Sequence, residues 1–579
     1  MLQFFKYVFA TLVGLFLFFL LIGIGSLFSS GDSVVSVKEN SVLQIDLNKQ
    51  IVENASIDNS FAAFLQTSVS KTGLVTLKEA IANAKLDPNV KGIYLDSEYP
   101  QAGFSTLGEL RIALKDFKES GKFVYSYGEV MSEKAVYLNS VADKVFLNKA
   151  GALEFNGLFG QVTFFKGLFD KIGVKPVIFK VGDYKSAVEP FFGTNLSPEN
   201  KEQMTSYLTS ISNQIYGEIA EDRGMTMVQI NELLNHPVNS ADKALEKGII
   251  TDAVYLDEFE AAVREKLGIK KDDKINFVSL EKYIKAKKYV ESGERNNRIA
   301  VIIGQGDIVS GETDGENIAS DSWIAELRKV VKDKKVKAIV LRINSGGGSA
   351  LASEIMWREI ELAKKEKPVY ASMGDYAASG GYYMAMACDT IVANPTTLTG
   401  SIGIFGMLVN AQELLNNKLG VTFDGVETHE HADFPSVVSE MSDVEKMMMQ
   451  NNVDRGYEKF TSKAAEGRKM KLENLKAVAG GRVWTGLQAK GNGLIDIIGN
   501  LEETVKLAAN RVGIKDDYQV KYYPTPKSEI DVIMDKIMNQ SSAKFDENLG
   551  MFAPYMKEIN KLVKMDKIQA RLPFELKIE

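Results

Sequence analysis

Ser379 stands in a setting that is typical of a serine nucleophile. It follows the small-residue stretch 374–378 and precedes Gly380 and Gly381, at an expected turn from a strand into a helix. Such a turn exposes a hydroxyl and presents the first N–H groups of the helix to a developing oxyanion. The alternative is a serine that only caps the helix, which is common. Both interpretations predict a strand, a turn and a helix here.

A glycine run, residues 346–348, follows an apolar segment that ends at Ile343. Glycines allow backbone N–H groups to approach a ligand or intermediate closely. Neither Gly-Lys-Ser/Thr nor Gly-x-Gly-x-x-Gly is present here, so a phosphate cradle is not indicated. The run predicts either an oxyanion donor or a plain flexible turn.

The base that would activate Ser379 is not obvious, because the chain has only three histidines, His236, His429 and His431. The last two form a His-Glu-His stretch that could act as a base, but the ligand count is too short to predict a metal site. A lysine is the other option, because desolvation in a cleft lowers the pKa of an amine. Residue types alone do not select one lysine.

The composition is that of a folded globular protein, with 579 residues, 45% hydrophobic and 25% charged. A single cysteine, Cys388, excludes an intrachain disulfide and zinc sites built on several thiolates. The net charge of −7 gives no basic patch for nucleic acid, so we expect no nucleic-acid partner. We also expect no cofactor.

The N-terminus predicts a membrane anchor over residues 1–31. Lys6 and Asp32 bracket 25 residues without a formal charge, and about 20 apolar residues span a bilayer as a helix. The small residues Gly23, Gly25 and Ser26 leave a signal-peptide cleavage open. Lys6 before the span places the rest of the chain on the extracytoplasmic side. The expectation is a single-pass protein of the inner (cell) membrane.

The rest of the chain repeats at an offset of about 246 residues. Residues 90–95 (VKGIYL) resemble 336–341 (VKAIVL), and 158–160 (LFG) resemble 404–406 (IFG). The repeat predicts two homologous domains. The expected organisation is a first domain over 40–285, a linker over 286–297, a second domain over 298–515 and a helical extension over 516–579.

Each repeat alternates short apolar runs with amphipathic stretches. In the second, apolar runs at 298–303 and 338–343 alternate with helical patterns at 323–334 and 350–365. This alternation predicts an α/β domain with a largely parallel sheet.

Comparing the repeats concentrates the nucleophile chemistry in the second. Ser379 falls on Glu133, Ser401 falls on Phe155, and the glycine run falls on residues 100–102 (PQA). The first copy therefore lacks both hydroxyls and the glycine run.

Three segments, 374–382 (GDYAASGGY), 399–406 (TGSIGIFG) and 481–486 (GRVWTG), resemble the signal peptide peptidase A family in its long, two-domain form. The resemblance covers nearly the whole chain. It implies an α/β fold of two tandem homologous Clp protease/crotonase-like domains with an N-terminal transmembrane helix. It also implies a homo-oligomer, a tetramer in the family.

The resemblance also implies a site divided between the copies. The family's lysine motif matches residues 184–191 (YKSAVEPF), whose counterpart in the second copy falls near His431. The implied roles are nucleophile for Ser379, base for Lys185, orientation of the lysine for Ser401, and oxyanion N–H donors for Gly347 and Gly380.

One position departs from the family pattern. Gly346 stands where the family usually has proline. Glycine loosens a turn that proline would stiffen, so preorganisation of the oxyanion site is the property in question.

The expected function is a membrane-anchored serine endopeptidase with a Ser/Lys dyad, which degrades cleaved signal peptides and other apolar peptides through an acyl-enzyme. One alternative is a catalytically inactive, membrane-tethered scaffold of the same fold, favoured only by Gly346. The other is a crotonase-like acyl-CoA enzyme, which would share an oxyanion pocket but would not need the Ser379 and Lys185 pair.

Overall fold

The computed structural model describes residues 35–55, 71–290, 293–312, 317–515, 517–524 and 567–572, with six isolated positions before residue 15. The predicted anchor over 1–31 and the helices expected within 516–579 lie almost wholly outside these residues. Among the described residues, no helix is both long and apolar enough to cross a membrane.

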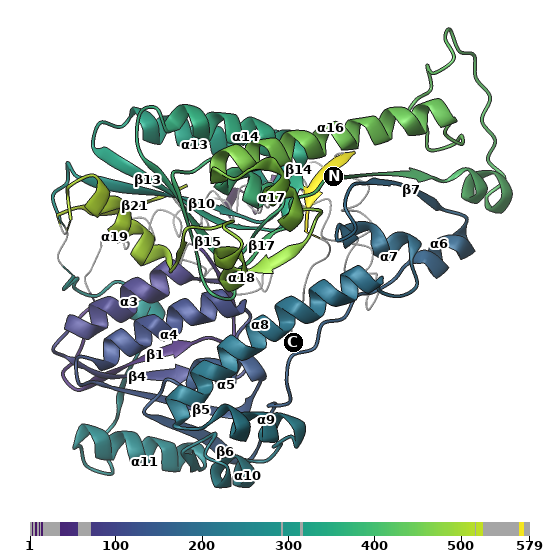
Figure 1. The fold of residues 1–579 in the computed structure, drawn as a ribbon. Helices are drawn as coiled ribbons and strands as arrows, with labels where there is room; N and C mark the ends of the chain where they lie inside the picture. The colour runs from purple at the N-terminus through teal and green to yellow at the C-terminus, as the bar shows by residue number, and fades with distance from the viewer. Residues whose placement is uncertain are drawn as a thin grey trace.

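The first copy is built on a parallel six-stranded sheet in the order β8-β6-β5-β4-β1-β9 (Figure 1). Its strands are β1 (Ser41–Asp46), β4 (Val90–Asp96), β5 (Phe123–Met131), β6 (Lys144–Leu153), β8 (Asp252–Ala253) and β9 (Asn276–Ser279). The short strands β2 (Gln50–Val52) and β3 (Lys71–Gly73) pair separately. Its helices are α3 (Leu74–Leu86), α4 (Phe104–Lys118), α5 (Glu133–Asn139), α6 (Lys166–Ile172), α7 (Glu189–Phe192), α8 (Pro198–Arg223), α9 (Met227–Asn235), α10 (Ala241–Glu246), α11 (Leu256–Leu267) and α12 (Leu280–Tyr283).

The second copy repeats this plan in the order β19-β17-β15-β13-β10-β21, with β16 also paired to β15 and β20 paired to β16. Its strands are β10 (Arg298–Gln305), β13 (Val336–Ser345), β15 (Val369–Ala378), β16 (Thr390–Ala393), β17 (Leu398–Gly400), β19 (Val483–Thr485), β20 (Ile497–Ile498) and β21 (Gln519–Tyr523). Its helices are α13 (Ser320–Lys332), α14 (Ala350–Ala363), α15 (Gly380–Ala385), α16 (Asp443–Arg468), α17 (Leu472–Val478), α18 (Gly486–Gly491) and α19 (Leu501–Arg511). The α/β fold in two tandem copies is confirmed.

A third sheet joins the two copies, in the order β12-β11-β14-β22-β18-β7. Its members are β7 (Lys175–Lys180), β11 (Ile308–Val309), β12 (Ile318–Ala319), β14 (Gly347–Ser349), β18 (Phe405–Asn410) and β22 (Ile568–Arg571). The glycine run thus forms strand β14 rather than the free turn left open by its composition. Gly348 must be glycine there, because a Cβ would lie 2.0 Å from the carbonyl oxygen of Ile308.

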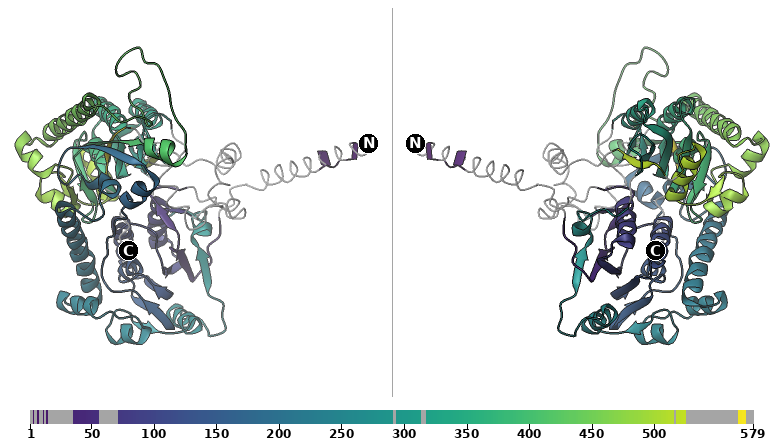
Figure 2. Two further views of the ribbon diagram at one scale, coloured as in Figure 1. Left: turned by 90° about the vertical axis from the view of Figure 1, so that its right-hand side faces the viewer. Right: turned by 90° about the vertical axis from the view of Figure 1, so that its left-hand side faces the viewer.

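The two main sheets lie one above the other with helices between them (Figures 1 and 2). Helix α3 packs its Val75 into an apolar cluster with Ile299, Val301 and Val340 of the second copy. The central strands β4 and β13 are buried over nearly their whole length, as expected for parallel sheets covered on both faces. This packing holds the lysine-bearing copy against the serine-bearing copy.

Candidate active site

Ser379 lies at the turn between β15 and α15, as its flanking residues predicted. Its backbone has φ 52° and ψ −111°, in the left-handed half of conformational space that non-glycine residues rarely adopt. The side chain makes no capping hydrogen bond. The hydroxyl is instead held by Lys185, so the capping alternative does not describe this residue.

Ser401 lies beside Ser379 because of strand register. Ala378 of β15 pairs with Gly400 of β17 in parallel, and each serine is the next residue of its chain segment. The N–H of Ser379 donates to the carbonyl of Gly400 at 2.8 Å. Ser401 also has a positive φ, 48°, and its N–H donates to the carbonyl of Arg482 at 2.7 Å.

Lys185 reaches these serines from the first copy through the joining sheet. Strand β7 pairs antiparallel with β18, with Lys180 opposite Phe405, and β18 begins four residues after Ser401. The Nζ of Lys185 lies 2.9 Å from Oγ of Ser379. It lies 3.1 Å from Oγ and 3.2 Å from the carbonyl oxygen of Ser401.

Burial sets the protonation of this lysine. Lys185 has no exposed surface, and burial lowers the pKa of its amine well below the ordinary value of 10.5. Within the described part of the chain, the hydrogen bonds of its Nζ go to oxygens of Ser379 and Ser401. Burial therefore favours the neutral form of the amine, which is the form that a general base requires.

Gly481 is a site residue whose role the sequence did not reveal. A Cβ there would lie 2.6 Å from N, Cα and Cβ of Lys185, and its φ is +84°. The preceding Gly480 accepts a hydrogen bond from the N–H of Tyr184 at 3.2 Å. The glycine pair lets the second copy close directly onto the lysine backbone. Its only signal in the sequence was its place at the start of the 481–486 segment.

Gln203 was also missed. This buried side chain on α8 donates from Nε2 to the carbonyl of Tyr184 at 3.1 Å and to Oγ of Ser186 at 2.7 Å. Its Oε1 accepts from the N–H of Val483 at 3.2 Å. Gln203 thus ties both neighbours of Lys185 to the strand after Gly481. A glutamine in an amphipathic helix carries no sequence signal for this.

The two predicted oxyanion donors lie together. Gly380 is the first residue of α15, where backbone N–H groups lack an acceptor within the helix. A Cβ on Gly347, whose φ is +100°, would lie 2.7 Å from the nitrogen of Gly380. The N–H of Gly347 donates to Oγ of Ser345 at 3.1 Å in this structure. An oxyanion bound by both glycines would replace that hydroxyl as acceptor.

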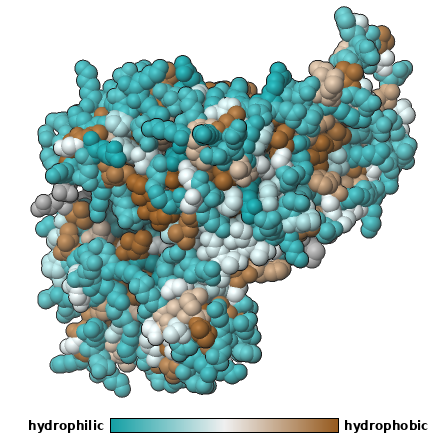
Figure 3. Space-filling view, in the orientation of Figure 1, coloured by the Kyte–Doolittle hydropathy of each residue, from teal (hydrophilic) through white to brown (hydrophobic). Residues whose placement is uncertain are grey.

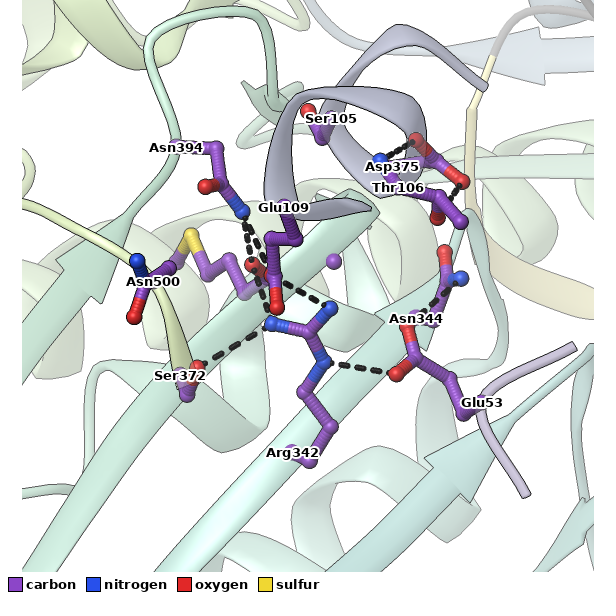
Figure 4. A network of polar contacts seen from close by, with 12 residues as sticks. Glu53, Ser105, Thr106, Glu109, Arg342, Asn344, Ser372, Asp375, Asn394 and Asn500 are labelled. Atoms are coloured by element: carbon purple, nitrogen blue, oxygen red, sulfur yellow. Dashed lines mark hydrogen bonds and ion pairs between the residues drawn. The ribbon is translucent and has the colours of Figure 1, made fainter. Parts of the chain in front are cut away.

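A buried ionic network crosses the copy interface below β15 (Figure 4). Nε of Arg342 lies 2.8 Å from Oε2 of Glu53, and its Nη2 lies 2.8 Å from Oε1 of Glu109. Burial alone would raise the pKa of Glu109, but Arg342 and Lys78 outweigh it and lower the pKa to about 2. Burial raises the pKa of Glu53, although Arg342 opposes this shift. Both carboxylates come from the first copy.

Asp375 forms a second tie, four residues before the nucleophile. Its Oδ1 accepts from the N–H of Thr106 at 2.9 Å, and its Oδ2 accepts from the Thr106 hydroxyl at 2.6 Å (Figure 4). These contacts attach β15 to the start of α4. The strand that carries Ser379 is therefore positioned by the first copy at two places.

The histidines lie elsewhere. His429 and His431 belong to the exposed segment between β18 and α16, where Nδ1 of His431 lies 3.3 Å from Oε1 of Glu445. His236 follows α9. Within the described residues, no histidine is hydrogen-bonded to Ser379 and no three His, Cys, Asp or Glu side chains form a possible metal cluster.

The corresponding position of the first copy holds a carboxylate. Glu133 begins α5, accepts from the N–H of Asn156 at 3.0 Å and is bonded by the hydroxyl of Tyr216. Burial raises its pKa. Glu133 and these partners thus stand where Ser379 and the side chains that contact it stand in the second copy.

Comparison with known proteins finds the same family in both copies. The family described as Peptidase family S49 matches residues 116–270 and 361–515, one stretch in each copy. Protease 4 of Haemophilus influenzae is 35% identical over 507 residues, covering 84% of this chain and 82% of that protein. The chloroplastic serine protease SPPA of Arabidopsis thaliana is 34% identical, covering 83% of this chain and 70% of its own.

A shorter relative matches only part of the chain. An Enterococcus faecium protein described as a candidate signal peptide peptidase SppA is 33% identical over 238 residues, covering 40% of this chain and 69% of its own. The matches to the full-length relatives and the family span both copies. The chain is a serine peptidase and belongs to peptidase family S49.

Proposed function

We propose that this protein is a membrane-anchored endopeptidase in which Ser379 and Lys185 form a catalytic dyad that degrades cleaved signal peptides. The observation that carries the proposal is the 2.9 Å contact between the Ser379 hydroxyl and a fully buried lysine amine. A nucleophile within hydrogen-bond reach of a base whose pKa is lowered is the general pattern of an activated serine.

In the proposed mechanism neutral Lys185 accepts the proton of Ser379 as Oγ attacks the scissile carbonyl carbon. The backbone N–H groups of Gly347 and Gly380 stabilise the tetrahedral oxyanion. The lysine ammonium then protonates the leaving amine, which departs and leaves an ester on Ser379. Water, deprotonated by the amine of Lys185, hydrolyses that ester. Ser401 keeps the amine directed at Ser379 in each step.

The substrate class follows from three considerations together. The predicted anchor over 1–31 would hold the site near a bilayer on the extracytoplasmic side of the cell membrane. Cleaved signal peptides are apolar segments that remain in that bilayer. The description of the Enterococcus faecium relative names the same substrate class. From the family resemblance of the sequence, we also propose that the two domains are related to the Clp protease/crotonase-like fold.

We also propose that the protein self-associates, through the arm formed by α6, β7, β18 and the segment after β18. Figure 3 shows apolar residues gathered on this arm. Exposed members include Leu168 (45%), Leu419 (62%) and Phe423 (53%). Apolar groups of this size on one projecting feature are typical of an interface.

The inactive-scaffold alternative would leave unexplained why a fully buried lysine amine is directed at the hydroxyl of Ser379. The acyl-CoA alternative would use the glycines but would leave the dyad unexplained.

Cleavage of a leucine-rich signal-peptide mimic by the full chain in detergent tests the proposal, with Ser379→Ala and Lys185→Ala alongside. Activity in the native protein that is lost in both variants supports it. Activity that survives Lys185→Ala contradicts the assignment of this lysine as the base. A folded native chain without activity favours the scaffold.

A further inference from the structure

Arg482 connects two segments that meet at the amine of Lys185. Its carbonyl oxygen accepts the N–H of Ser401 at 2.7 Å, and Ser401 contacts the amine directly. Its guanidinium contacts Tyr184, the residue immediately before Lys185. The main chain of Arg482 thus holds one partner of the amine, and its side chain holds the segment that carries the lysine.

The guanidinium contacts Tyr184 in two ways. Its Cζ lies 4.7 Å from the centroid of the tyrosine ring, and its Nη1 donates to the tyrosine hydroxyl at 3.1 Å. The same Cζ lies 4.5 Å from the ring centroid of Trp484, two residues further along the chain. A planar guanidinium is attracted to aromatic faces and can donate hydrogen bonds at its edge at the same time. A lysine ammonium is a point charge without a plane and cannot reproduce both contacts.

Glu202 on α8 completes this cluster from the first copy. Nη2 of Arg482 lies 2.8 Å from its Oε1, and the Tyr184 hydroxyl donates to its Oε2 at 3.0 Å. The Glu202 side chain is 56% exposed, whereas that of Arg482 is 20% exposed. An ion pair to an exposed carboxylate contributes little. The contacts with Tyr184 are therefore the ones expected to fix the guanidinium.

The place of this cluster matters because the lysine is packed closely on the same side. Gly481, the residue before Arg482, lies so near that an added Cβ would be 2.6 Å from the backbone of Lys185. A displacement of about 1 Å in a catalytic group can cost roughly 100-fold in rate. Loosening of Tyr184 would also admit water to the amine. Since burial is what lowers the pKa of Lys185, entry of water would raise it.

We propose that Arg482 is a positioning residue for the reaction, which holds Ser401 through its carbonyl and Tyr184 through its guanidinium and so keeps Lys185 directed at Ser379. Arg482 does not touch the reacting atoms and acts through the lysine. The inference rests on the proposed function of the dyad. It adds a requirement for a planar guanidinium at position 482, contributed by the second copy, to hold a lysine contributed by the first.

The test uses two variants of the full chain in detergent. Arg482→Lys keeps the positive charge but removes the planar group, and Arg482→Ala removes both. Arg328→Lys is the matched control, because Arg328 pairs with Glu359 on the surface and its side chain is 62% exposed. Cleavage of the leucine-rich signal-peptide mimic gives kcat and KM for each protein across a series of pH values.

Arg482→Lys is expected to lower kcat about 10- to 100-fold with KM changed less than about twofold, because the geometry of the base is altered. The rising limb of kcat/KM should move to higher pH, because a less buried amine becomes neutral only at higher pH. Part of the loss should therefore be recovered at high pH. Arg482→Ala should show the same changes more strongly, and Arg328→Lys should show none of them.

Native kinetics in Arg482→Lys would overturn the proposal, because charge alone would then suffice. A reduced kcat with an unmoved rising limb would also overturn it, and so would a raised KM with kcat unaltered. A double-variant cycle tests the path through Tyr184. Added to Tyr184→Ala, the change Arg482→Lys should have little further effect, and additive losses would contradict this path.

Thermal melting shows whether each variant is folded, and the conservative Arg482→Lys carries the test if Arg482→Ala is not. Labelling of Ser379 by a serine-directed phosphonate separates this inference from the proposed function. Slower labelling in Arg482→Lys than in the native chain supports the positioning role, and equal labelling rates contradict that role alone. A folded native chain that is neither labelled nor able to cleave contradicts the dyad itself.

Discussion

Glu109 and Arg342 meet across the two copies with 2.8 Å between Oε1 and Nη2, and neither side chain has any exposed surface. Glu53 lies on the other side of the same guanidinium. Desolvation of these charges is costly, and only their mutual attraction and hydrogen bonds repay it. The pair therefore makes correct docking of one copy on the other strongly favoured over docking in any other register.

Removing one partner should consequently be severe. Arg342→Met takes the guanidinium away from buried Glu53 and leaves Glu109 with Lys78, and it is expected to lower the free energy of unfolding by about 3–5 kcal/mol. Arg328→Met is the matched control, because Arg328 pairs with Glu359 on the surface and the change is expected to leave the free energy of unfolding nearly unaltered. Denaturant unfolding of both variants measures the difference. Equal small losses would contradict the role given to the network.

Lys185→Met should abolish cleavage, with a fall in kcat of about 10⁴-fold or more. It should also change how stability depends on pH. The folded pKa of Lys185 lies below its unfolded value of 10.5, so the unfolded state binds more protons between the two. Native stability should rise with pH across that window.

The comparison of native protein and Lys185→Met by unfolding at a series of pH values isolates this contribution. The difference in the free energy of unfolding between the two proteins should shrink as the pH approaches 10.5 from below. A difference independent of pH would mean that the lysine is not buried as a neutral amine. The rising limb of kcat/KM should lie in the same window, well below the ordinary lysine range.

Ser401→Ala should lower kcat/KM about 10- to 100-fold, because one hydrogen bond that directs the amine is lost while the dyad itself remains. Since Ser401 acts through the lysine, the same change made in Lys185→Met should have no further effect. Steady-state kinetics of the two single variants and the double variant form the cycle. Additive losses would show that Ser401 has a separate role.

Gly481→Ala should displace Lys185, because the new Cβ would lie 2.6 Å from its backbone and the residue holds a φ of +84°. Loss of most activity is expected, together with destabilisation by about 1–3 kcal/mol. Gly491→Ala, at the end of α18, is the control, since nothing lies within 4 Å of its added Cβ. Its activity should equal that of the native chain. Thermal melting and peptide cleavage test both variants.

Much of this architecture was accessible from the sequence. The offset of 246 residues predicted two copies, and the small residues around Ser379 predicted the strand, turn and helix that carry it. Local sequence patterns predict such features because the features depend on residues that are close together in the sequence. The lysine was selected among many only through the resemblance of residues 184–191.

The remainder depended on pairings between distant segments. The hydrophobic periodicity of residues 175–180 gave no indication that they would pair with β18 of the other copy. The closeness of Gly481 to Lys185 and the bridge made by Gln203 depend on the same docking. The glycine run was compatible with a turn, and it became a strand because β11 and β22 lie on either side of it.

Because Lys185 and Ser379 lie in different copies, the order of translation affects when the chain can become active. On the ribosome Lys185 emerges first, and Ser379, Ser401 and Gly481 follow up to about 300 residues later. At ordinary elongation rates of roughly 5–20 residues per second, that delay is about 15–60 s. During this interval the lysine is solvated, protonated and unable to act as a base. Proteolytic competence therefore cannot arise before the segment that contains Gly481 has been synthesised.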